Sequence, residues 1–283
     1  MTTPSDASDW RAMSQRERDL GLNNSVAVEG STEIVAGWEK LSHDMRARHP
    51  DHLDLRYGPR PRNRIDFLKV RDHAPTLLFI HGGYWQTRAK EIFTHFAAGP
   101  MAHGINVALI GYTLAPDATL DEIVAEIHAG IDFLAGQLPA LGGDTNGIVV
   151  SGWSAGGHLT SVALSHSQVR AGMAISGIYD LEPIRASYLN AKLGLDEAMS
   201  RRNSPMMQAG GAPKPLSLVV GSVELPLLRR QTADFAGHRA KYGLPVTYEE
   251  IPGANHFTIM DEMAAATGRI TTLTRQLVER TAG

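Results

Sequence analysis

The pentapeptide Gly-Trp-Ser-Ala-Gly at positions 152–156 constrains the local fold more than any other feature of this 283-residue chain. It directly follows the apolar run at 147–151, which has the composition of a buried strand. Glycines near Ser154 permit a turn that is too tight for side chains. The small residues that follow, at 157–164, are typical of a helix packed closely under a sheet. We therefore predict a strand, a sharp turn that exposes the Ser154 hydroxyl, and a helix.

Short apolar strands alternate with helical segments along most of the chain. Strands are predicted at 76–80, 106–110, 147–150, 171–175, 216–220 and 246–250, after two earlier ones at 53–57 and 63–70. Helices are predicted near 91–103, 120–138, 156–164, 228–242 and 261–281. This alternation is typical of the α/β class, with a mostly parallel central sheet and helices on both faces.

The chain shows no internal repeat and no low-complexity linker, so we expect one α/β domain over residues 1–283. Residues 1–50 are polar, with one amphipathic segment from about 31 to 49, which predicts a helical extension. Residues 188–211 do not follow the strand–helix rhythm. They predict a small lid-like insertion between two late strands.

Composition narrows the classes of partner and chemistry. The net charge of −3 gives no basic stripe, and no apolar run is long enough for a membrane span, so we expect neither nucleic acid nor membrane as a partner. The absence of cysteine excludes thiol catalysis, and no metal or nucleotide motif is present, so we expect no cofactor. The polar start of the chain predicts a cytoplasmic protein, and the sequence is compatible with a homodimer.

A serine nucleophile needs a base and an acid that orients the base. His256 lies in a Gly-Pro loop after the last predicted strand and is the only histidine beyond that strand. Glu224 follows the preceding strand, which gives the order serine, acid, histidine. Asp180 is the alternative acid, because it follows the strand before that one.

Two successive glycines directly follow the strand predicted at 76–80. The N–H groups of Gly82 and Gly83 can approach a substrate oxygen without interference from side chains, and the Ala155 N–H group can join them. These groups predict an oxyanion hole beside Ser154. His81 is expected to brace this loop through hydrogen bonds.

Aromatic side chains flank both motifs. Tyr84, Trp85 and Trp153 are adjacent in sequence to the predicted reacting groups, and Tyr188 lies in the insertion. We predict that these four residues wall the pocket for a small ester or amide substrate. Met206 and Met207 are expected to close it from the insertion.

The chain resembles the α/β-hydrolase superfamily, in the branch with a His-Gly-Gly oxyanion motif, and within it the arylformamidases (kynurenine formamidases). The resemblance covers about residues 20–260. Its motifs are His-Gly-Gly-Tyr-Trp at 81–85, Gly-Trp-Ser-Ala-Gly-Gly-His at 152–158, the asparagine pair at 23–24, and Leu-Arg-Tyr-Gly-Pro at 55–59 preceding Arg-Ile-Asp at 64–66. The family's aspartate is expected in a Ser-Pro-Glu-like turn, where this chain has Glu224 followed by Leu and Pro.

The resemblance implies hydrolysis of an aryl formamide, N-formylkynurenine, in tryptophan catabolism. From the predicted serine, histidine and acid we expect a two-step mechanism through an acyl-enzyme on Ser154. A general carboxylesterase that acts on short-chain or aryl esters is the alternative function.

Overall fold

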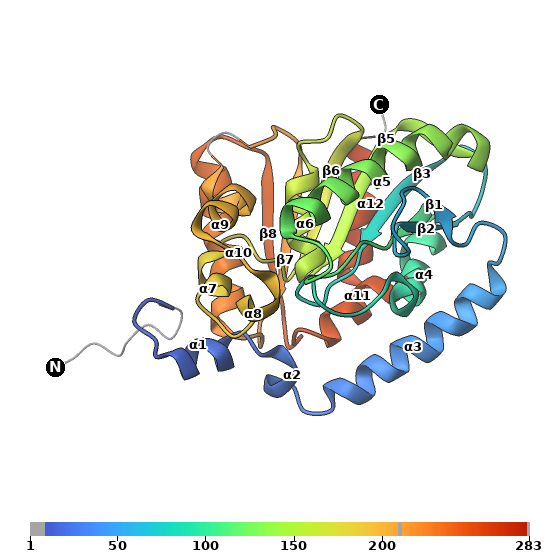
Figure 1. Cartoon of the computed structure of the whole chain (residues 1–283). Coiled ribbons are helices and arrows are strands. Elements are labelled where there is room, and N and C mark those ends of the chain that lie inside the picture. Colours follow the sequence, from blue (N-terminus) through green and yellow to red (C-terminus); the bar gives the residue numbers. More distant parts are fainter. Residues whose placement is uncertain (1–8, 209–210, 282–283) are drawn as a thin grey trace.

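The computed structural model of the chain describes residues 9–208 and 211–281. One eight-stranded sheet forms its centre, in the order β1-β2-β4-β3-β5-β6-β7-β8 (Figure 1). The pairs β1–β2 and β2–β4 are antiparallel, and every later neighbouring pair is parallel. The strands are β1 (Leu55–Arg56), β2 (Arg64–Leu68), β3 (Ala74–Ile80), β4 (Asn106–Ile110), β5 (Gly143–Trp153), β6 (Val169–Ile175), β7 (Leu216–Gly221) and β8 (Val246–Ile251).

Helices connect the strands and cover the sheet. Three precede it: α1 (Gln15–Gly21), α2 (Asn24–Ala27) and α3 (Ser31–Arg48). Those within and after it are η1 (Lys90–Ala97), α4 (Ala98–Ala102), α5 (Leu120–Leu141), α6 (Ala155–Ala163), α7 (Glu182–Arg185), α8 (Asn190–Leu193), α9 (Glu197–Asn203), η2 (Pro205–Met207), α10 (Pro226–Lys241), η3 (Thr258–Met260), α11 (Asp261–Ala264) and α12 (Arg269–Thr281). The prefix η marks 3₁₀ helices.

The inner strands β3, β4, β6 and β7 are buried along almost their whole length, which explains their apolar runs, whereas the edge strand β8 is half-buried or exposed along most of its length. Successive residues of β5 point to opposite faces, so Ile148 and Val150 join one hydrophobic core whereas Val149 joins the other. Helices α5, α6 and α10 contribute buried side chains to the first core. Helices α3, η1, α11 and α12 contribute to the second. The predicted α/β architecture is therefore confirmed.

Two predicted helices differ in their detail. The segment predicted as one helix at 261–281 is broken between α11 and α12, because the Gly268 N–H donates to the Ala265 carbonyl and forms a turn. The Glu262 carboxylate then accepts from the Arg269 N–H, and so supports the start of the second helix. The segment predicted at 91–103 begins as the 3₁₀ helix η1 and continues as α4. Among the described helices, none has the length and apolarity that crossing a bilayer requires.

A buried cluster of charges joins the start of η1 to the sheet and to α3. The Asp66 carboxylate on β2 is fully buried, and it accepts from Lys90 Nζ at 2.8 Å, from the Asp54 N–H at 2.7 Å, and from Arg46 of α3. Lys90 directly follows the loop at 81–89. The cluster therefore anchors one end of the glycine loop that was predicted to hold an oxyanion.

Replacing Asp66 with asparagine is expected to lower the free energy of unfolding by about 2 kcal/mol, because Lys90 and Arg46 both lose their fully buried carboxylate partner, while Asp54 and Glu91 still pair with Lys90. Urea denaturation measures the change. Asp72→Asn is the matched control, since Asp72 forms an exposed ion pair with Lys69 that contributes about 1 kcal/mol at most. Equal effects of the two substitutions would contradict this role of the cluster.

Candidate active site

Ser154 lies in the sharp turn between β5 and α6, with backbone angles φ 59° and ψ −118°. A positive φ is strained for a residue with a side chain. The neighbouring glycines explain how the turn closes: a Cβ on Gly152 would lie 2.3 Å from the Gly156 carbonyl oxygen, and a Cβ on Gly156 would lie 2.0 Å from that of Ile80 on β3. The turn therefore has the geometry predicted from its glycines.

His256 is held next to this turn by its side chain and by its backbone. Its Nδ1 atom lies 2.7 Å from Glu224 Oε2, and both residues are buried. Trp153, directly before Ser154, donates from Nε1 to the His256 carbonyl at 2.8 Å. An ionised carboxylate can only accept a hydrogen bond, so Nδ1 carries the hydrogen, and Nε2 of the neutral ring keeps its lone pair.

Glu224 reaches His256 because hydrogen bonds join the loops after β7 and β8. Val223 N–H donates to the Ala254 carbonyl at 3.2 Å, and Gly253 N–H donates to Ser222 Oγ at 2.8 Å. The second carboxylate oxygen of Glu224 accepts from the Gly221 N–H at 2.7 Å. These contacts hold the Glu224 carboxylate beside His256 Nδ1, on the edge of the imidazole ring opposite the Nε2 lone pair.

Asp180 does not occupy this place. Its carboxylate accepts from the Glu182 N–H at 3.0 Å, and its own N–H donates to Gln231 Oε1. It lines a different pocket, together with Arg11 and Asp234. Burial raises the pKa of its carboxyl group. Of the two acids that the sequence left open, only Glu224 contacts His256.

The glycine loop after β3 packs against the serine turn. A Cβ on Gly82 would lie 2.7 Å from the Trp153 carbonyl oxygen and 3.1 Å from Ser154 Cβ. Within the part of the chain that the structure describes, no protein acceptor is bound to the N–H groups of Gly82, Gly83 or Ala155. Three backbone donors near Ser154 are therefore free to bind a substrate oxygen.

The His81 side chain contacts the glycine loop and supports it. Its ring stacks on Tyr112 with centroids 4.3 Å apart, and its Nδ1 lies 2.8 Å from the Gly82 carbonyl oxygen. Burial lowers the pKa of His81 to about 3. The ring is consequently neutral near pH 7, which fits bracing rather than proton transfer.

Ser154 and His256 open into one pocket of about 230 Å³. Three of the four predicted pocket aromatics, Tyr84, Trp153 and Tyr188, line it. Its other described lining residues are Asn23, Asn24, Ser25, Gly83, Gln86, Thr87, Arg88, Leu189 and Phe257.

Comparisons with known proteins agree with this arrangement. The BD-FAE family model matches residues 68–192. The chain is 26% identical to the kynurenine formamidase of Danio rerio, over 96% of this chain and 99% of that protein, and 29% identical to the kynurenine formamidase of Salmo salar, over 78% and 80%. The solved structure of a candidate thioesterase from Silicibacter sp. tm1040 matches with a TM-score of 0.82 at 24% identity, covering 90% of this chain and 97% of that one.

The chain is an α/β-hydrolase. Its predicted resemblance to the arylformamidase and His-Gly-Gly esterase branch is confirmed by the relatives that it matches.

One predicted pocket residue of this hydrolase lies elsewhere. Trp85 is fully buried in the first hydrophobic core, where its ring meets His158 edge-on at 5.0 Å, and it is not among the residues that line the pocket. The chain turns sharply at Tyr84 and Trp85, both of which have positive φ, and this sends the two neighbouring side chains in different directions. Met206 and Met207 line the pocket of Asp180 rather than that of Ser154.

The start of the chain contributes to the pocket in a way that sequence reasoning did not assign. Tyr84 donates its hydroxyl to the Leu22 carbonyl at 2.6 Å, and Asn24 Nδ2 donates to the Tyr84 hydroxyl oxygen at 3.3 Å. These bonds hold residues 23–25 against the glycine loop. The asparagine pair at 23–24 was the one available signal, and it entered only through the family resemblance.

Ser176, at the end of β6, is a second residue that the sequence analysis missed. It has φ +50°, and its hydroxyl donates to Glu224 Oε1 at 2.5 Å. No motif marks it; only its position at the carboxyl end of a parallel strand, beside β7, could have suggested it.

We expect Ser176→Ala to lower kcat about tenfold with little change in KM, because the bond that orients Glu224 is lost and a hydrogen bond to a charged group contributes about 1.5 kcal/mol. Steady-state kinetics on any substrate that the enzyme turns over measures it. Ser204→Ala is the matched control, since Ser204 is equally buried but bonds only to backbone groups of Ser200 and Leu181. If both variants lose the same activity, Ser176 has no special role.

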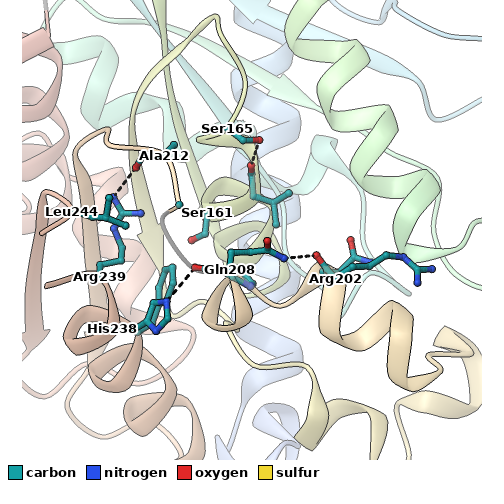
Figure 2. A pocket seen from close by; sticks show the side chains of 13 residues that line it. Ser161, Ser165, Arg202, Gln208, Ala212, His238, Arg239 and Leu244 are labelled. Carbon is teal, nitrogen blue, oxygen red and sulfur yellow. Dashed lines mark hydrogen bonds between the residues drawn. The ribbon is translucent and has the colours of Figure 1, made fainter. Parts of the chain in front are cut away.

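A second pocket, of about 290 Å³, is lined by residues of α6, η2 and α10 and of the segments next to them. Figure 2 shows its side chains from close by. Ser161 of α6 and Ser165, just beyond its end, face Gln208, His238 and Arg239 across the pocket. None of the residues predicted to act in catalysis is among its described lining residues. Within residues 9–208 and 211–281, no group of three or more His, Asp or Glu side chains is arranged to hold a metal ion.

Proposed function

We propose that this hydrolase cleaves an aryl formamide through an acyl-enzyme on Ser154. The observation that carries the proposal is the contact between His256 Nδ1 and Glu224 Oε2, with Ser154 and His256 opening into the same pocket. The kynurenine formamidases that the chain matches over most of its length support the choice of substrate class.

In the proposed first step, His256 Nε2 takes the proton of the Ser154 hydroxyl as its oxygen attacks the formyl carbon. Glu224 keeps the Nδ1 hydrogen in place and stabilises the imidazolium that forms. The free N–H groups of Gly82, Gly83 and Ala155 bind the oxygen that becomes negative, and each such donor contributes about 3 kcal/mol to stabilising the transition state.

In the remaining steps, the imidazolium gives its proton to the leaving aryl amine, and the formyl group stays on Ser154. A water molecule then attacks the formyl ester, with His256 as the base again, and formate and the free serine result. The small pocket of about 230 Å³ fits a one-carbon acyl group and a single aromatic leaving group.

The test is hydrolysis of N-formylkynurenine against hydrolysis of 4-nitrophenyl acetate, with Ser154→Ala as the blank. A kcat/KM for the formamide well above that for the ester would support the proposal. Turnover of the ester without turnover of the formamide would replace it with a carboxylesterase on the same framework.

A further inference from the structure

Arg88 lines the pocket of Ser154 and lies near the end of the glycine loop at 81–89. Its guanidinium carbon lies 5.9 Å from the centre of the Trp153 ring, within the range of a cation–π contact. The backbone at Arg88 has φ +74°, and its carbonyl accepts a hydrogen bond from Arg62. The Arg88 side chain thus lies over Trp153, the residue directly before Ser154.

Among the described residues, no acidic side chain forms an ion pair with Arg88. None of the described lining residues of this pocket is an aspartate or a glutamate. Among the described residues, no hydrogen bond or ion pair uses the Arg88 side chain, although a guanidinium has five N–H donors. Partial burial disfavours the charged form and lowers the pKa of Arg88, yet an arginine remains protonated in proteins.

Neighbouring polar groups of the pocket already use their donors within the protein. Gln86 Nε2 donates to the Leu189 carbonyl at 2.9 Å, and Thr87 Oγ1 donates to the Gly83 carbonyl at 3.1 Å. Tyr84 donates to the Leu22 carbonyl. The guanidinium of Arg88 therefore stands out as a group with unused donors and an unpaired charge beside Ser154.

We propose that Arg88 selects substrates whose leaving group carries a carboxylate, which it binds over the Trp153 ring. A partly buried guanidinium without a counter-ion is costly, and a planar carboxylate is the group that its fork of donors fits. The inference rests on the proposed function. A formyl group has a single carbon, the one that is attacked, so it cannot itself carry the carboxylate. The carboxylate must then lie on the aryl amine side of the scissile bond.

Two synthetic formamides that differ in one group provide the test: 3-(2-formamidobenzoyl)propanoate and its neutral amide, 3-(2-formamidobenzoyl)propanamide. The wild-type enzyme is expected to have the higher kcat/KM on the propanoate. In Arg88→Gln, the ratio of the two values is expected to fall about 10- to 100-fold, while kcat/KM for the neutral amide changes little. Arg88→Lys keeps the charge but not the fork and should retain part of the preference.

Arg202→Gln is the matched control, because Arg202 lines the second pocket and pairs with Asp121. It should leave the ratio unchanged. If the wild type hydrolyses both compounds equally, or if Arg88→Gln keeps the preference, the role of Arg88 is overturned while the formamidase proposal stands.

If the wild type hydrolyses neither compound, turnover of N-formylkynurenine decides the formamidase proposal separately, and calorimetric titration of both compounds then decides the role of Arg88. Tighter binding of the propanoate that is lost in Arg88→Gln would support that role. Equal binding, or no binding of either compound, would overturn it.

Discussion

Ser154→Ala is expected to lower kcat about 10⁶-fold, the effect of removing the nucleophile from a serine hydrolase. The reason is that no other hydroxyl lies in the turn between β5 and α6, next to the free N–H groups of Gly83 and Ala155. The measurement is steady-state turnover of N-formylkynurenine and 4-nitrophenyl acetate, with circular dichroism as the control for folding. Turnover within tenfold of the wild type would show that Ser154 is not the nucleophile.

A companion substitution tests the strain in the same turn. Ser154→Gly removes the same hydroxyl, but glycine tolerates the φ of 59° that strains every other residue. We expect the free energy of unfolding of the Ser154→Gly variant to be about 1 kcal/mol higher than that of Ser154→Ala. Equal stabilities would indicate that the turn is relaxed.

Glu224→Gln is expected to lower kcat about 10⁴-fold. The amide that replaces the carboxylate can donate a hydrogen bond to His256 Nδ1, and this favours the tautomer whose Nε2 carries the hydrogen and cannot act as a base. Removal of the negative charge also leaves the imidazolium of the transition state unsupported. Steady-state kinetics on the better substrate of the wild type measures the loss.

Asp180→Asn is the matched control for Glu224→Gln. Asp180 is partly buried and also lies near the carboxyl end of the sheet, but its bonds are to Glu182 and Gln231 and not to His256. It should keep kcat within about threefold of the wild type, as expected for a residue that does not contact the reacting groups. A larger loss in Asp180→Asn than in Glu224→Gln would move the acid role to Asp180.

Much of the fold could be predicted because its signals are local. Runs of apolar residues separated by helical patterns predicted six strands, and β3 to β8 lie at those places. The turn at Ser154 could be predicted for the same reason: its closure depends on Gly152 and Gly156, which are its neighbours in the chain. The break between α11 and α12 was missed, since one turn at Gly268 leaves the apolar periodicity nearly intact.

Contacts between distant segments decided the rest of the site. Sequence reasoning favoured Glu224 and left Asp180 as the alternative acid, and only the pairing of β7 with β8, with the bonds between their loops, shows that Glu224 reaches His256. Likewise, Tyr84 and Trp85 are adjacent and both aromatic, yet one lines the pocket and the other fills the core.

The sequence by itself therefore determined the α/β class, the turn that carries Ser154 and the glycine loop, because short segments with strong backbone requirements specify them. The tertiary structure alone decided which acid contacts His256, that Ser176 supports this acid, and that Arg88 stands without a counter-ion beside Trp153. These features come from side chains that meet at the carboxyl edge of the sheet from strands far apart in the chain, and their meeting depends on strand order and loop packing.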